Sequence, residues 1–230
     1  MILHHGTSLT RARSAILKGL LPRAQSGLNS FPLTPAHPHC VYLTDTYPLY
    51  FAENARRQDK DDFAVVISID TSKLIEDAFL PDEDALEQIN RGADGLPSTM
   101  SSSERTQHYR RSLSDFMGST GWETSLSLLG TCAFMGTIAP EAFASVAVVD
   151  TEAQAKLMIW ATDFSISLNH FRAAAETQKM LTHRATTGTW PAISTSVERS
   201  IPEGFRSAID SRDGLQIYGP DEFREWITSR

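Results

Sequence analysis

Cysteine is scarce in this chain of 230 residues, which contains Cys40 and Cys132 and no others. Two cysteines supply neither the repeated spacing of a zinc site nor the framework of a disulfide-rich secreted domain. His37, His39 and Cys40 are metal-ligand types, but no second cluster in the sequence would complete four ligands. We therefore expect no metal site, and we expect two reduced thiols in a cytosolic protein.

Long apolar runs are missing as well. No stretch approaches the roughly 18–20 apolar residues of a transmembrane helix, and the N-terminus lacks the basic and apolar regions of a secretory signal. We expect a cytoplasmic protein without membrane association. The sequence also lacks a Gly-rich phosphate loop of the P-loop or dinucleotide-binding type, so a nucleotide would have to bind in another way. The net charge of −7 disfavours global attraction to nucleic acid but leaves room for a local basic groove.

The patterns that are present predict an α+β protein. Residues 1–150 read as a core with an irregular insertion near 91–124, and residues 151–230 read as a helical C-terminal extension packed on that core. The acidic stretch 77–84 reads as a surface turn. Strands are expected at 2–8, 41–44, 63–69, 143–149, 193–197 and 215–218. Helices are expected at 9–20, 48–57, 84–89, 103–116, 152–181 (one helix or a helix pair) and 220–227.

Two short stretches near the N-terminus carry the chemistry. The first contains His5-Gly6-Thr7 at the end of an expected strand, and the second contains Val41-Tyr42-Leu43-Thr44 in another. A glycine beside an imidazole lets a flat ligand approach the main chain closely. A phenol ring at the same edge offers a stacking surface at roughly 4.5–7 Å between ring centroids. These residues together predict a pocket for a nicotinamide-like heterocycle.

The ordered set of His5-Gly6-Thr7, Ile16-Leu17-Lys18-Gly19-Leu20 and Val41-Tyr42-Leu43-Thr44 resembles the start of the ADP-ribosyltransferase superfamily. The branch it resembles is typified by diphtheria toxin and the poly-ADP-ribose polymerases, which have a His–Tyr–Glu motif. The resemblance implies split, mostly antiparallel small sheets around an NAD cleft. It implies that His5 holds a ribose hydroxyl, that the Gly6 backbone holds the nicotinamide amide and that Tyr42 stacks on the ring. The other expected cofactor-binding residues are Thr7, Leu43, Thr44 and Phe51.

The third motif departs from the family pattern. The family places a Glu on a strand that would correspond to residues 130–134, where this chain has Thr131, Cys132 and Ala133. Glu123, upstream, is our first candidate for that role, and Glu141, Thr131 and Cys132 stay open. Catalysis by Cys132 as a nucleophile would need a histidine partner, and no histidine is spaced in a way that pairs it with Cys132. The apolar flanks of Cys132 indicate a buried residue. The missing Glu argues against polymer synthesis and leaves transfer of single units or an inactive enzyme.

A basic segment follows in the insertion. Arg105, Tyr109, Arg110 and Arg111 lie in the helix expected at 103–116. Arginines beside an aromatic ring suit the phosphate and base of a nucleic acid, so we expect these four residues to bind the acceptor substrate. The alternative is a solvated helix with ordinary surface arginines.

The resemblance implies a mono-ADP-ribosyltransferase that uses NAD and modifies RNA, DNA or protein, with nucleic acid slightly preferred. Small solitary transferases of this kind resemble toxins of toxin–antitoxin or phage-defence systems, and a toxic chain would be expected to have an antitoxin partner. RNA 2′-phosphotransferases share the His-Gly-Thr opening and also consume NAD, although Tyr42 departs from their second motif. Two non-enzymatic readings stay open as well: a catalytically inactive module that binds NAD or ADP-ribose, and an interaction protein with neither property.

Overall fold

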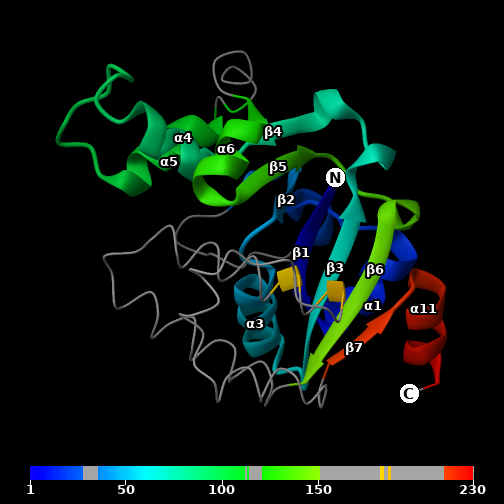
Figure 1. Cartoon of the computed structure of the whole chain (residues 1–230). Coiled ribbons are helices and arrows are strands. Elements are labelled where there is room, and N and C mark those ends of the chain that lie inside the picture. Colours follow the sequence, from blue (N-terminus) through cyan, green and yellow to red (C-terminus); the bar gives the residue numbers. More distant parts are fainter. Residues whose placement is uncertain are drawn as a thin grey trace, which may run out of the picture.

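The computed structural model describes residues 1–27, 36–111, 113, 121–150, 182–183, 186–187 and 215–229. Their strands and helices make a mixed α+β fold, in which one antiparallel sheet carries helices on its faces (Figure 1). This confirms the α+β class predicted from the sequence. No helix within these ranges is long and apolar enough to cross a membrane.

Seven strands form the sheet, in the spatial order β4-β5-β2-β1-β3-β6-β7. Each neighbouring pair is antiparallel. The interior strand β3 is buried along most of its length, as its nearly continuous run of aliphatic residues predicts for a strand covered on both faces. The strands are β1 (Ile2–Ser8), β2 (Cys40–Thr44), β3 (Phe63–Asp70), β4 (Phe79–Pro81), β5 (Thr131–Met135), β6 (Phe143–Asp150) and β7 (Leu215–Tyr218).

Helices cover both faces of this sheet. Ile16 and Phe223, from two helices on one face, share a hydrophobic core with Leu3 of β1. Gly6 of β1 points to the opposite face because side chains alternate along a strand, and there it lies against the helix Pro48–Asp59. The helices are α1 (Leu9–Lys18), α2 (Arg23–Ser26), α3 (Pro48–Asp59), α4 (Glu83–Asn90), α5 (Ser102–Arg111), α6 (Trp122–Leu129) and α11 (Pro220–Thr228), with short 3₁₀ turns η1 (Thr71–Lys73), η2 (Glu76–Ala78) and η4 (Pro140–Ala142).

β1 and β2 share fewer register pairs than any other neighbouring strands of the sheet. β1 pairs with β3 continuously from Ile2↔Asp70 to Ser8↔Ala64, but the register of β1 with β2 contains the single pair His4↔Thr44. The described strands therefore form one hydrogen-bonded sheet in place of the expected pair of small sheets. Its two parts, β4-β5-β2 and β1-β3-β6-β7, meet at one position and leave a seam between β1 and β2.

The described end of the chain completes the sheet. β7 pairs with β6 from Val146↔Tyr218 to Val149↔Leu215, so β7 is an edge strand of the core sheet. α11 follows it and packs beside α1. The strand expected at 215–218 and the helix expected at 220–227 are confirmed. The helix expected at 152–181 and the strand expected at 193–197 lie outside the described residues.

Candidate functional site

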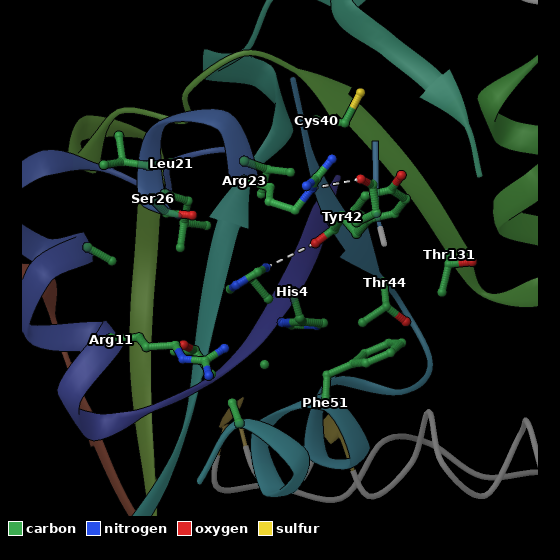
Figure 2. A pocket seen from close by; sticks show the side chains of 18 of the residues that line it. His4, Arg11, Leu21, Arg23, Ser26, Cys40, Tyr42, Thr44, Phe51 and Thr131 are labelled. Atoms are coloured by element: carbon green, nitrogen blue, oxygen red, sulfur yellow. Dashed lines mark hydrogen bonds between the residues drawn. The ribbon is translucent and has the colours of Figure 1, made fainter. Parts of the chain in front are cut away.

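A pocket with a volume of about 340 Å³ lies at the seam between β1 and β2. Figure 2 shows its walls, with Arg11 of α1, Arg23 of α2, Tyr42 of β2 and Phe51 of α3 turned toward one cavity. Because the strands are joined at one position, residues from both faces of the sheet reach this space. The sequence-predicted residues that line it are His5, Gly6, Thr7, Tyr42, Thr44, Phe51, Arg110 and Thr131.

His5 spans the seam with its side chain. Its Nδ1 lies 3.0 Å from the main-chain oxygen of Tyr42, and a carbonyl can accept a hydrogen bond but cannot donate one. Nδ1 therefore carries the ring proton, which leaves Nε2 as an acceptor. Burial lowers the pKa of His5, so the ring is neutral near pH 7. A neutral imidazole with a fixed tautomer is suited to accept a hydrogen bond from a ligand hydroxyl.

Tyr42 is held at its phenol end. Its hydroxyl lies 2.7 and 2.6 Å from Oε1 and Oε2 of Glu83 and accepts a hydrogen bond from the backbone N–H of His37 at 3.0 Å. Burial, together with the neighbouring Glu83 and Asp82, raises the pKa of Tyr42 well above its usual value. The phenol therefore stays protonated and donates to the carboxylate. These contacts fix the position of the ring in the pocket wall.

Glu83 is a pocket residue that the sequence patterns did not identify. It is the first residue of α4, its exposed fraction is 2%, and it receives a hydrogen bond from Nε of Arg110 at 2.7 Å. The surface turn expected at 77–84 is wrong for Asp82 and Glu83, which are buried. The available signal was the position of these carboxylates directly after the apolar residues of β4.

Asp82 lies beside Glu83 and also lines the pocket. Its carboxylate caps α4 by accepting from the backbone N–H of Asp84 at 2.9 Å. Burial, with the adjacent charges of Glu83 and Asp84, raises the pKa of Asp82 to about 7. A carboxyl group that titrates near neutrality is well matched to proton transfer at physiological pH.

Glu123, our first candidate for the third catalytic position, does not line the pocket. It lies exposed in the first turn of α6, with Oε2 near Gly121. Thr131, which also stayed open for this position, is buried in the pocket wall on β5. Cys132 is fully buried in the hydrophobic core, and burial raises the pKa of its thiol. Leu43 also belongs to this core and not to the pocket lining.

The four residues of the basic segment do not all lie at the pocket. Arg105 and Tyr109 are buried in α5 and both contact Asp94, with Tyr109 Oη 2.9 Å from Oδ2. Neither residue lines the pocket, and Arg111 is exposed outside it. Arg110 alone of the four reaches the pocket, where it pairs with Glu83. The expected acceptor-binding helix therefore contributes one of its four residues to the cavity.

His4 also lines the pocket, although strand alternation places it on the face opposite to His5. Its Nδ1 is hydrogen-bonded to Oγ of Ser68 at 3.1 Å. Burial lowers the pKa of His4 from 6.5 to about 4, while Asp45 acts in the opposite direction and His183 in the same direction. His4 and His5 are thus both uncharged at neutral pH.

We expect His4 to make the folded state sensitive to acid. Between pH 6.5 and about 4 the unfolded chain binds this proton and the folded chain does not. The stability associated with neutral His4 is complete above pH 6.5 and is lost as the pH falls toward 4. Denaturant midpoints measured across this range should decrease less steeply for His4→Gln than for wild type. The exposed His39→Gln is the control, and equal slopes for wild type and His4→Gln would contradict the expectation.

The described residues contain no group of three or more His, Cys, Asp or Glu side chains placed to hold a metal ion. The pocket combines two neutral imidazoles, a protonated phenol, two buried carboxyl groups and three guanidinium groups. It is therefore able to bind a polar heterocycle with hydroxyl groups and to accept a proton.

A scan against protein-family models and a search of curated proteins each find no match for this chain.

Proposed function

We propose that this chain is a mono-ADP-ribosyltransferase that transfers ADP-ribose from NAD to a macromolecular acceptor, with nucleic acid as the first acceptor class to test. The observation that carries the proposal is the 3.0 Å contact between Nδ1 of His5 and the main-chain oxygen of Tyr42, from which the tautomer of the ring is assigned. Its Nδ1 donates to the main chain of Tyr42, so Nε2 is left to accept from a ribose hydroxyl. The volume of the pocket, about 340 Å³, is within the usual range for a small-molecule site.

The other pocket residues support NAD as the substrate. Tyr42 offers a fixed aromatic ring beside His5, which suits the nicotinamide ring. Cleavage of the nicotinamide–ribose bond develops positive charge on the ribose, and the buried carboxylate of Glu83 would stabilise that charge. The seam between β1 and β2 also supports the split-sheet fold of the ADP-ribosyltransferase superfamily as the architecture that we propose.

The test is incubation of the purified chain with NAD labelled in its ADP-ribose part, together with total RNA, DNA or cell lysate in parallel. Wild type should label one of these fractions and release nicotinamide. His5→Ala should lower both signals by roughly 10²–10³-fold, as expected for loss of a preorganised polar contact. His108→Ala, an exposed histidine that does not line the pocket, is the matched control and should retain wild-type activity.

Two results would overturn the proposal. Tight binding of NAD or ADP-ribose without release of nicotinamide would identify a binding module instead of an enzyme. Release of nicotinamide that requires an RNA 2′-phosphate, with the phosphate removed from the RNA, would identify a phosphotransferase.

A melting temperature of His5→Ala close to that of wild type would show that the lost activity belongs to the site and not to the fold.

A further inference from the structure

The pairing of the edge strands explains how Glu83 reaches Tyr42. β4 pairs with β5 at Leu80↔Ala133, and β5 pairs with β2 at Tyr42↔Ala133, so these three residues form one row across the sheet. Ala133 in the middle is small and fully buried. The Tyr42 side chain can therefore extend past it toward the start of α4, where Glu83 follows the end of β4. This contact depends on long-range strand pairing.

The carboxylate of Glu83 is anchored and still has acceptor capacity. Oε1 receives Nε of Arg110, and the single proton of the Tyr42 hydroxyl is shared between Oε1 and Oε2 at 2.7 and 2.6 Å. A carboxylate offers about four lone-pair sites. A ligand hydroxyl or an attacking group can therefore be accepted at Oε2 while Arg110 continues to compensate the buried charge.

We propose that Glu83 is the carboxylate that assists the transfer, and that Arg110 and Tyr42 are positioning residues that hold it in the pocket. The inference rests on the proposed function. It assigns to the junction of β4 and α4 a role for which the sequence patterns offered residues before β5, on β5 and after it. Of the candidates from the sequence, Glu123 is exposed outside the pocket. Glu141 is also exposed outside it, and its main-chain oxygen accepts from Nζ of Lys73.

The chemistry balances with groups that the site and its substrates supply. The bond between the ribose carbon and the nicotinamide nitrogen breaks, and nicotinamide leaves as a neutral molecule with the bonding electrons. The hydroxyl or amine of the acceptor forms the new bond to the same ribose carbon. Its proton passes to the Glu83 carboxylate and from there to water, so the step releases one nicotinamide and one proton for each acceptor modified.

The experiment compares Glu83→Gln with Glu123→Gln in the full chain, and follows NAD binding separately from nicotinamide release. Glu83→Gln keeps the shape of the side chain and removes its charge. We expect release to fall roughly 10²–10³-fold while the dissociation constant for NAD changes by less than about tenfold, since the ground state keeps its other contacts. Glu123→Gln should behave as wild type in both assays.

Because Glu83→Gln leaves Arg110 without its counter-charge, Tyr42→Phe is the second variant. It removes one hydrogen bond to Glu83 and leaves the Arg110 pair intact, so we expect a smaller loss in kcat with little change in KM. Wild-type nicotinamide release by a folded Glu83→Gln protein, or an unchanged kcat in Tyr42→Phe, would overturn the proposed role of Glu83. Either result would leave the proposed function in place. Absence of NAD turnover by the wild-type protein would instead overturn the proposed function.

Discussion

Replacement of Gly6 by alanine should lower the free energy of unfolding by about 3 kcal/mol. A Cβ atom at this position would lie 2.0 Å from the main-chain oxygen of Pro48 and 2.5 Å from the main-chain nitrogen of Ala52. Both neighbours are backbone atoms of α3, so the overlap cannot be relieved by a side-chain rotation. The helix must move away from β1, and its contacts with the sheet are weakened. Denaturant unfolding followed by circular dichroism measures the loss.

Gly121→Ala is the matched control for this change. A Cβ atom on Gly121 would approach Oε2 of Glu123 at 2.9 Å, but that oxygen is the end of a flexible side chain. We expect a loss below about 1 kcal/mol, because alanine is less favourable than glycine at this N-cap but the Glu123 side chain can rotate away from the new methyl group. Equal stability of Gly6→Ala and wild type would show that α3 does not require the glycine. The close approach of a ligand to the backbone would then remain as the reason for glycine at this position.

Arg105→Ala should destabilise the protein by about 3–5 kcal/mol, which is typical when one partner of a buried ion pair is removed. The exposed fraction of the Arg105 side chain is 3%, and it pairs with Asp94 while Nη2 donates to the main-chain oxygen of Pro97 at 2.7 Å. Removal of the guanidinium leaves the Asp94 carboxylate without this partner inside the protein. The melting temperature and the denaturant midpoint should both decrease.

Arg111→Ala, on the same helix but exposed, should change stability by less than about 0.5 kcal/mol. The two variants also distinguish two interpretations of Arg105. The sequence predicts that it binds the acceptor, whereas the structure indicates that it stabilises the fold. If Arg105 bound the acceptor, Arg105→Ala would lose activity at unchanged stability. The buried contact with Asp94 predicts lost stability, and that result would assign the residue to the fold.

Much of the fold could be predicted because its signals are local. β3 was visible as an apolar run, and α3 and α11 were visible through periodicity, with bounds that differ by a few residues from Pro48–Asp59 and Pro220–Thr228. β4 was not predicted, since a strand of three residues carries too little pattern. Its existence depends on pairing with β5, more than fifty residues later in the chain.

The candidate site also contains residues with local sequence signals and a residue whose position depends on long-range strand pairing. His5, Gly6 and Tyr42 belong to two short motifs near the N-terminus, and the structure places all three around the pocket. Glu83 could not be predicted in this way because acidic residues in a turn are usually exposed. Its burial follows from β4 pairing and from the compensating charge of Arg110. The sequence patterns therefore favoured Glu123 as the carboxylate, at a position where the structure has a surface residue.

The single pair between β1 and β2 has a consequence for how the protein moves. Strands joined by few ladder bonds separate at lower free energy than strands joined by many, so we expect β1 to separate from β2 more easily than from β3. A molecule that contacts both His5 on β1 and Tyr42 on β2 would link the two parts of the sheet across the seam. Its binding free energy would then be added to the stability of the sheet, and we expect the occupied protein to be more rigid than the empty one.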